Sequence, residues 1–297
     1  MFETWRKCTA NGETVTDTVA ADRGETDTGS DIREWNAASY HRVANPHVDW
    51  GRAVLDRLPL RGDETVLDAG CGTARLTALL LERLPRGRVI ALDQSANMLD
   101  QARASLEPRF GNRVSYLHSD LLALGREPDL ERAVDVVFST ATFHWVRDHP
   151  ALFRALFQTL KPGGRLIAQC GGGPNLATVA ARAMVILRSD RYAPLVGDWP
   201  GPWEFADPAT TADRLGAAGF IEVETGLVHA PVTMPDAGAY REFLTTVVLG
   251  THLERIPDET LRREFIASLV DAGAADTPPF VLDYWRLNLR ARRPANQ

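Results

Sequence analysis

The sequence predicts an α/β protein built on a doubly wound, mostly parallel β-sheet. From about residue 65 to residue 170, short apolar runs alternate with helical patterns, and this alternation is typical of a parallel sheet with helices on both faces. The first run reaches Asp68 and leads into the turn Gly70-Cys71-Gly72, where the backbone can approach a ligand closely. Later runs also end at or near an acid. We therefore expect a ligand crevice where the carboxyl ends of the strands meet.

Length and composition limit the classes of protein to which this sheet can belong. A chain of 297 residues, 44% of them hydrophobic, can bury one large core or two small ones. The net charge of -6 argues against a basic surface for nucleic acid or anionic lipid. Neither an apolar run near the ~20 residues that span a bilayer nor the pattern of a secretory signal is present. We expect a soluble cytoplasmic protein that binds neither nucleic acid nor membranes.

The three cysteines predict neither a disulfide framework nor a metal site. Cys8, Cys71 and Cys170 are odd in number and far apart, and no pair has the spacing of metal ligands. We expect no bound metal, and Cys71 and Cys170 are expected to be small buried fillers.

The N-terminal part is expected to be a disordered acidic tail followed by a cover for the sheet. Residues 1–30 are rich in Thr, Asp, Glu and Gly and show no apolar periodicity. Order is expected from Asp31 through a helical pattern at Trp50–Leu58, which Pro59 and Gly62 end. Residues 31–297 are predicted to form one domain, with the cover at 31–60.

The following elements alternate between strand and helix. Apolar runs of four to six residues bounded by turn residues suit buried strands, whereas longer amphipathic stretches suit helices. The expected strands are Thr65–Asp68, Arg88–Asp93, Val114–His118, Val134–Ser139 and Arg165–Cys170. The expected helices between them are Leu76–Leu84, Ala96–Leu106 and Pro150–Leu160.

Helical segments interrupt the last strands. We expect helices at Leu176–Arg188, Asp207–Ala218, Pro235–Leu249 and Asp258–Ala272, and strands at Ile221–His229 and near Phe280–Leu289. None of the boundaries has the composition of a linker. The sequence thus predicts helical insertions at about 174–220 and 235–275, the first with a proline-bracketed aromatic loop that suits a lid or pocket wall.

The acids at the strand ends predict the kind of ligand. Asp68, Asp93 and Asp120 follow three strands whose carboxyl ends open into one crevice. A carboxylate after the second strand suits a ribose, because both ribose hydroxyls can donate hydrogen bonds to it. Asp120 is placed to meet a purine edge.

A dinucleotide-binding domain is the main alternative, because it also has glycines after the first strand and an acid after the second. Asp68 stands just before the glycines and would repel a pyrophosphate at the helix N-terminus. A third glycine is also missing, since Ala74 follows Thr73. A ligand with a cationic end therefore fits this turn better.

Four motifs in order resemble the class I S-adenosylmethionine-dependent methyltransferases. They are Val66-Leu-Asp-Ala-Gly-Cys-Gly-Thr-Ala74, Ala91-Leu-Asp-Gln-Ser95, Ser119-Asp-Leu121 and Leu160-Lys-Pro-Gly-Gly-Arg-Leu166, and the resemblance covers about residues 35–293. It implies a Rossmann-like fold with seven strands, the last one antiparallel, and a helical cap. It also implies S-adenosyl-L-methionine as cofactor. Ala74 departs from the glycine that this family often has, and a slight adjustment of the turn is expected.

The resemblance assigns the cofactor site residue by residue. Asp68 would lie near the methionine amino group, Asp93 would bind the ribose, and Asp120 with Leu121 would hold the adenine. The implied set of cofactor-binding residues is Tyr40, Asp68, Gly70, Cys71, Gly72, Asp93, Gln94, Met98, Asp120, Leu121 and Ser139.

Further motifs resemble the trans-aconitate methyltransferase group. They are Phe143-His-Trp-Val146, Trp35-Asn36 with Tyr40, Leu249-Gly250 with Leu253 and Pro257, and Tyr284-Trp-Arg-Leu-Asn-Leu289. The resemblance implies methylation of a small molecule, at a carboxylate or a hydroxyl, by a monomer or homodimer. N- or C-methylation, a non-methylating S-adenosylmethionine-binding protein and a nicotinamide-dependent oxidoreductase are the alternatives. The candidate substrate residues are His144, Trp145, Trp203, Tyr240 and Arg286.

His144 has two readings of similar weight. It stands after the fourth strand, where it is the best-placed base for a phenol, amine or enol, or it orients the substrate. Alternatively its ring bonds the backbone beside Trp145 and serves the structure alone. A carboxylate acceptor would need no base.

Overall fold

Seven strands form one sheet in the order β3-β2-β1-β4-β5-β9-β6, and β9 is the only one of them that runs opposite to the other six. The computed structural model describes residues 45–296, which fall within one compact unit. The sheet strands are β1 (Thr65–Ala69), β2 (Arg88–Asp93), β3 (Val114–His118), β4 (Val134–Thr140), β5 (Leu160–Gly171), β6 (Ile221–His229) and β9 (Trp285–Arg292). The predicted doubly wound, mostly parallel sheet is confirmed.

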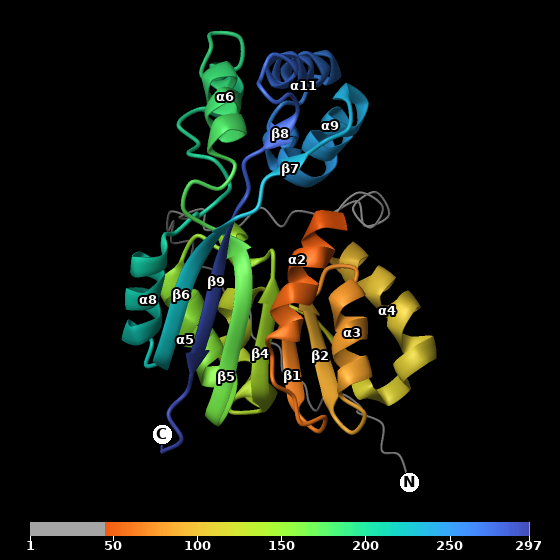
Figure 1. Ribbon diagram of the computed structural model, residues 1–297, viewed down its shortest axis with the longest axis vertical. Coiled ribbons are helices and arrows are strands. Elements are labelled where there is room, and N and C mark those ends of the chain that lie inside the picture. The colour runs from red at the N-terminus through yellow and green to blue at the C-terminus, as the bar shows by residue number, and fades with distance from the viewer. Residues whose placement is uncertain (1–44, 297) are drawn as a thin grey trace, which may run out of the picture. The chain divides into compact units, whose positions relative to one another are not determined.

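Helices cover both faces of the parallel part of the sheet (Figure 1). One face packs on α2 (Asn45–Asp56), α3 (Arg75–Arg83) and α4 (Ala96–Phe110), and the other on α5 (His149–Thr159) and α8 (Pro208–Ala217). Successive side chains of β1 point to opposite faces of the sheet. Val66 packs in the core beneath α2, α3 and α4, and Leu67 packs in the core beneath α5 and α8; both are fully buried. Short 3-10 turns at 111–113, 121–126, 128–130 and 143–145 complete the connections.

The helical insertions have a hydrophobic core of their own. It is formed from α6 (Ala177–Leu187), α7 (Ala193–Val196), α9 (Ala237–Phe243), a π-helix (Leu244–Val248) and α11 (Glu259–Ala274), next to the short α10 (Gly250–Glu254). Its fully buried members include Leu187, Tyr240 and Phe265. These helices lie beyond the carboxyl ends of the parallel strands (Figure 1), so they can cover a ligand bound there.

The last predicted strand is split in two. Residues Val281–Leu282 (β8) pair with β7 (Val232–Thr233) in a separate ribbon, and the sheet strand β9 starts only at Trp285. The chain leaves the ribbon at Asp283, whose carboxylate accepts hydrogen bonds from the backbone and hydroxyl of Thr178. Apolar residues stand on both sides of Asp283, and no turn residue such as Gly or Pro separates them, so the local pattern did not mark the change.

Two sequence predictions fall outside the described residues. The acidic tail at 1–30 and the first part of the cover, residues 31–44 with Tyr40, lie before residue 45. Across residues 45–296, no helix is both long enough and apolar enough to cross a bilayer.

Ala74 has a left-handed backbone conformation, with φ 64°. It stands at the start of α3, and its methyl group is buried in the core around this helix. Ala74 therefore has the backbone conformation that usually favours glycine.

Arg293 closes the C-terminal end of α5. Its Nη1 donates hydrogen bonds to the carbonyl oxygens of Phe157 (2.9 Å) and Leu160 (2.8 Å), and its guanidinium lies 4.6 Å from the centre of the Phe157 ring. These two carbonyl groups lie at the C-terminal end of α5, where the last carbonyl groups have no N–H of the same helix four residues further on.

We expect Arg293→Met to lower the free energy of unfolding by about 2–3 kcal/mol, because it leaves buried carbonyl groups without donors while keeping an apolar stem. Urea unfolding followed by circular dichroism measures the loss. The neighbouring Arg292→Met is the matched control: its side chain is exposed and its contacts are long, so we expect a loss below about 1 kcal/mol. Equal losses in the two variants would contradict the capping role.

Candidate active site

The glycine turn between β1 and α3 is held against β2 by its own backbone. The N–H groups of Gly70 and Cys71 both donate to the carbonyl oxygen of Leu92, at 2.9 and 2.8 Å. Gly70 has φ 83°, and a Cβ there would lie 2.2 Å from Oγ1 of Thr142. The backbone can therefore take this path only without a side chain at position 70.

Gly72 and Asp93 form the front of the same turn. The Gly72 N–H donates to Oδ2 of Asp93 (2.9 Å), and the Ser95 N–H donates to Oδ1 (3.0 Å). A Cβ at Gly72 would meet no atom of the described chain within 4 Å, so the backbone is open on this side. These two backbone donors hold the carboxylate in place at the front of the turn.

Asp68 is a buried carboxyl group behind the glycines. It is 2% exposed, and the hydroxyl of Thr77 donates to its Oδ2 at 2.6 Å. Burial raises the pKa of Asp68 to about 7, the nearby Asp93 adds to the rise, and the Thr77 bond opposes it. A cation beside this carboxyl group would restore its ionised form, which suits the positively charged end of a ligand.

The other predicted cofactor residues in the described chain are buried or make hydrogen bonds within the protein. Oδ1 of Asp120 accepts a hydrogen bond from the Leu122 N–H (2.9 Å) at the start of a 3-10 turn, and the Ser139 hydroxyl donates to the Ala69 carbonyl (2.7 Å) across β1 and β4. Burial raises the pKa of the Cys71 thiol, so it stays protonated. Met98 and Leu121 are buried apolar residues, and the Gln94 carbonyl bonds the His118 ring.

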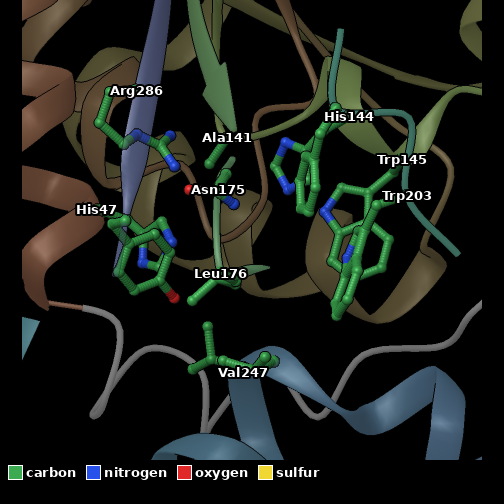
Figure 2. Close-up of a pocket in the computed structure, with 12 residues that line it drawn as sticks. His47, Ala141, His144, Trp145, Asn175, Leu176, Trp203, Val247 and Arg286 are labelled. Carbon is green, nitrogen blue, oxygen red and sulfur yellow. The ribbon is translucent and has the colours of Figure 1, made fainter. Parts of the chain in front are cut away.

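An inner cavity lies beside this turn. Thr142 donates to the Gly70 carbonyl (3.3 Å), and its neighbour Ala141 lines the cavity, so the two regions meet after β4. Figure 2 shows Arg286 and His47 on one side, and His144, Trp145 and Trp203 on the other. Twelve described residues line it: His47, Ala141, His144, Trp145, Asn175, Leu176, Trp203, Phe205, Val247, Val248, Tyr284 and Arg286.

Aromatic rings form one wall of the inner cavity. The Trp203 ring stacks on Phe205, with centroids 5.3 Å apart and planes 17° apart, and contacts Trp145 at 6.0 Å. Phe205 in turn lies 5.7 Å from the His144 ring. The wall joins the turn after β4 to the loop before α8, and it offers flat apolar surface to a ligand.

Arg286 brings a buried positive charge to the opposite side. It is 2% exposed, its guanidinium lies 4.6 Å from the centre of the Trp50 ring, and its Nε donates to Oε1 of Gln169 (3.4 Å). The other end of Gln169 donates to Oδ1 of Asn288 (2.9 Å), which also accepts from Arg57. These hydrogen bonds orient the side-chain amide of Gln169 so that its Oε1 faces Arg286.

His144 is a neutral hydrogen-bond donor. Its pKa lies well below the ordinary value because the ring is buried and Arg286 is close. Its Nδ1 accepts a hydrogen bond from the Gly171 N–H (3.3 Å), so the ring proton is on Nε2. A ring held in this state can donate a bond to an oxygen of a ligand, whereas a base would need a free lone pair.

Comparisons with known proteins decide the family. Residues 66–164 match the family described as methyltransferase domain. A trans-aconitate 2-methyltransferase of Methylobacterium radiotolerans is 36% identical over 252 residues, which cover 84% of this chain and 92% of that protein. One from Azoarcus sp. is 30% identical over 235 residues, covering 76% of this chain and 84% of that protein. The chain belongs to the trans-aconitate methyltransferase family. It is an S-adenosylmethionine-dependent methyltransferase, as its motifs predicted.

Solved structures agree on the fold. The phosphoethanolamine N-methyltransferase 2 of Haemonchus contortus in complex with S-adenosyl-L-methionine aligns with a TM-score of 0.54 at 19% identity, over 87% of this chain and 56% of that one. The YcgJ protein of Bacillus subtilis aligns with a TM-score of 0.58 at 14% identity, over 84% and 99%. At these identities the likeness concerns the fold alone.

The structure brings most of the candidate methyltransferase residues together. Asp93 lies close enough to Asp68 and Cys71 to raise the pKa of both, and His144, Trp145, Trp203 and Arg286 all line the inner cavity. Tyr240 does not line it. Its ring is fully buried in the core of the insertion, against Gly273 and Phe280, because α9 turns this face toward α11.

Sequence reasoning missed several cavity residues. His47 comes from α2 near the start of the described chain, Asn175 from the segment between β5 and α6, and Val247 and Val248 from the π-helix. Asn175 had a usable signal, since it follows the glycines after β5, at the carboxyl edge of the sheet. Nothing local distinguished His47. Residues 45–296 also contain no group of three His, Cys, Asp or Glu side chains placed to hold a metal ion.

Binding of S-adenosylmethionine is expected to tighten as the pH rises from 5.5 to 7. The pKa of Asp68 is raised from 3.8 to about 7, so the unliganded protein loses stability as the pH rises from about 4 to 7, and a cationic ligand recovers that loss. The dissociation constant should fall by up to about tenfold per pH unit. Calorimetry should detect proton release near pH 6.

Asp68→Asn is the matched control for this pH dependence. It cannot ionise but can still accept the Thr77 bond, so we expect weaker binding that hardly changes between pH 5.5 and 7. The same pH dependence in the variant and the parent protein would rule out Asp68 as its source.

Proposed function

We propose that this methyltransferase transfers the methyl group of S-adenosylmethionine to a carboxylate oxygen of a small acid. The observation that carries the proposal is a set of convergent donors in the inner cavity: the Arg286 guanidinium, the Nε2–H of His144 and the amide of Asn175. Oδ1 of Asn175 accepts a bond from the Trp285 N–H (2.9 Å), so its amide nitrogen remains as a donor on the cavity lining. A guanidinium and two neutral N–H donors that converge on one cavity suit an anionic acceptor.

The relatives support the same chemistry. They are trans-aconitate 2-methyltransferases, and trans-aconitate is an organic acid. Methylation of a nitrogen or carbon atom would call for a group that removes a proton, and the neutral His144 is already held as a donor. The family assignment also disfavours the nicotinamide-dependent oxidoreductase considered from the sequence.

The residues that would hold S-adenosylmethionine lie around the glycine turn. We assign Asp68 to its cationic amino group, Gly70 to Gly72 to close backbone approach, Asp93 to the ribose, and Asp120 with Leu121 to the adenine. Buried Asp68 and the open face of Gly72 fit such a group. When bound, S-adenosylmethionine supplies a methyl group already activated by a positively charged sulfur.

The protein's own contribution is positioning. A carboxylic acid is ionised at neutral pH, so no group has to remove a proton from the acceptor. His144, Asn175 and Arg286 hold the carboxylate, and the Trp145, Trp203 and Phe205 rings keep water away from it. Holding the acceptor in one orientation accounts for most of the rate in such a transfer. A cytoplasmic location, a monomeric or homodimeric state and the absence of nucleic-acid binding stay predictions from the sequence.

Asp93→Ala is expected to weaken S-adenosylmethionine binding at least about 100-fold, because two hydroxyl-to-carboxylate bonds are lost. Titration calorimetry measures the affinity, and thermal unfolding checks that the variant is folded. Asp100→Ala removes an exposed carboxylate on α4 and should bind as the parent protein does. Full affinity in Asp93→Ala would refute the ribose assignment.

His144→Phe is expected to lower kcat/KM for the acid about 10- to 150-fold at saturating cofactor, the effect of one bond to a charged group. His144→Gln can place an amide donor near the Nε2 position and should retain much more activity. Since the pKa of His144 is low, kcat/KM of the parent enzyme should stay flat from pH 6 to 8. A rise through pH 6.5 that disappears in both variants would instead identify His144 as a base.

A further inference from the structure

We propose that Arg214 on α8 is a positioning residue that sets His144 for methyl transfer. It fixes the carbonyl groups of two successive residues in the turn at 143–145, one through His149 and one through Glu204. This inference rests on the proposed function, in which His144 donates a hydrogen bond to the carboxylate of the acceptor. Arg214, His149 and Glu204 are not among the twelve described residues that line the inner cavity, so they act from behind its wall.

One nitrogen of Arg214 holds two side chains from different segments. Its Nη1 donates hydrogen bonds to Nδ1 of His149 (3.0 Å), at the start of α5, and to Oε1 of Glu204 (2.9 Å), in the loop before α8. A guanidinium has only donors, so the histidine nitrogen is the acceptor. The bond to Glu204 joins opposite charges on side chains that are 25% and 31% exposed, so solvent screens it less than an ion pair on the open surface.

His149 extends this constraint to the turn that carries His144. Since its Nδ1 accepts from Arg214, the ring proton is on Nε2, which donates to the carbonyl oxygen of Phe143 at 3.0 Å. The ring is 1% exposed, and burial lowers the pKa of His149, so the ring is neutral at pH 7. A neutral ring has one donor and one acceptor, and both are used here. The position of Arg214 therefore fixes the Phe143 carbonyl group.

Glu204 fixes the next carbonyl group of the same turn. Its backbone N–H donates to the carbonyl oxygen of His144 (2.9 Å), while its carboxylate accepts from Arg214. Its neighbours Trp203 and Phe205 line the inner cavity, so the aromatic wall and the His144 turn are joined at Glu204.

Helix α8 anchors these three residues to the sheet. Arg214 precedes Leu215, which is fully buried in the core beneath α5 and α8. The same sheet carries the glycine turn after β1, to which the cofactor is assigned. The bonds to the two carbonyl groups thereby hold His144 in a fixed place relative to the methyl donor. A misplacement of about 1 Å can cost about 100-fold in rate, even when the substituted residue is far from the chemistry.

Arg214→Met keeps an apolar stem and removes the donors. With the full chain, trans-aconitate as acceptor and saturating S-adenosylmethionine, the methyl ester and S-adenosylhomocysteine are measured by mass spectrometry. We expect kcat/KM to fall about 10- to 100-fold. The dissociation constant of S-adenosylmethionine, measured by calorimetry, should change less than about threefold, because the glycine turn is untouched.

Two further substitutions control for charge and for position. Arg214→Lys can still donate from its ammonium group, and it should retain at least about fivefold more activity than Arg214→Met. Arg154→Met, at an exposed position on α5, is the matched control and should behave as the parent enzyme does.

A double substitution separates positioning from a general loss of structure. In the His144→Phe background no donor is left to position, so Arg214→Met should cost at most about threefold there, a clear departure from additivity. Glu204→Ala removes one arm of the arrangement and should lower kcat/KM about 3- to 10-fold in the parent enzyme, but at most about twofold in His144→Phe. Thermal unfolding checks the fold of each variant, and Glu204→Ala decides the question if Arg214→Met does not fold.

Nitrogen NMR of the histidine rings gives a test that needs no acceptor. In protein with isotope-labelled histidine, the signals of His144 are those missing from His144→Phe. The parent protein should show Nδ1 unprotonated and Nε2 protonated, as the bond from the Gly171 N–H requires. In Arg214→Met the turn is released and this bond of 3.3 Å weakens, so we expect the two nitrogen signals to move toward each other as the tautomers mix.

The outcomes separate this inference from the proposed function. Equal losses from Arg214→Met in the parent and His144→Phe backgrounds, or His144 signals that Arg214→Met leaves unchanged, overturn the positioning role and leave carboxylate methylation in place. If the parent enzyme binds S-adenosylmethionine but forms no ester from trans-aconitate, fumarate or crotonate, the proposed function is overturned. The NMR measurement then still decides whether Arg214 holds the His144 ring.

Discussion

The carbonyl oxygen of Leu92 accepts two hydrogen bonds, from the N–H groups of Gly70 and Cys71, and the rest of the site depends on this constraint. It fixes the turn after β1 against the end of β2. As a result the Gly72 N–H reaches Asp93, and the Gly70 backbone meets Thr142 at the end of β4. The ends of three strands are thereby joined, and the inner cavity begins at Ala141, the residue before Thr142.

Two buried ionisable groups, one acidic and one basic, lie in different parts of the site. Asp68 lies behind the glycine turn with a raised pKa, and Arg286 lies across the inner cavity, on β9. A cationic cofactor favours the ionised form of Asp68, and an anionic acceptor complements Arg286. The positive charge of Arg286 also helps to keep His144 neutral, so that the histidine acts as a donor. Electrostatics thus assigns the two ligands to different ends of one crevice.

The helical insertions contribute residues to the inner cavity but none to the glycine turn that is assigned to the cofactor. Their core is distinct from the two cores on the faces of the sheet, so their helices can differ without disturbing the glycine turn. The second insertion contributes Val247 and Val248 to the cavity, and the first insertion contributes Trp203 and Phe205. Members of one family can therefore share the cofactor site while differing in the acid that they bind.

Local signals explain why the parallel part of the fold was predictable. The strands β1 to β4 match their predicted bounds within one residue, because short apolar runs ended by turn residues have few other solutions. The glycines and acids of the cofactor turn could be named for the same reason. The end of the chain was less clear, since the apolar residues on both sides of Asp283 read as one strand although they belong to the ribbon and to the sheet.

By itself, the sequence determined the sheet, the glycine turn and the cationic character of the cofactor, since these depend on residues close together along the chain. Only the tertiary structure decided which aromatic and polar side chains line the cavity. It placed Tyr240 in the core of the insertion and brought His47 beside Arg286, which lies 239 positions away (286 minus 47). It also set the proton position on His144 through Gly171, and the raised pKa of Asp68 through burial. Burial and long-range contacts belong to the packed chain, and local sequence patterns do not contain them.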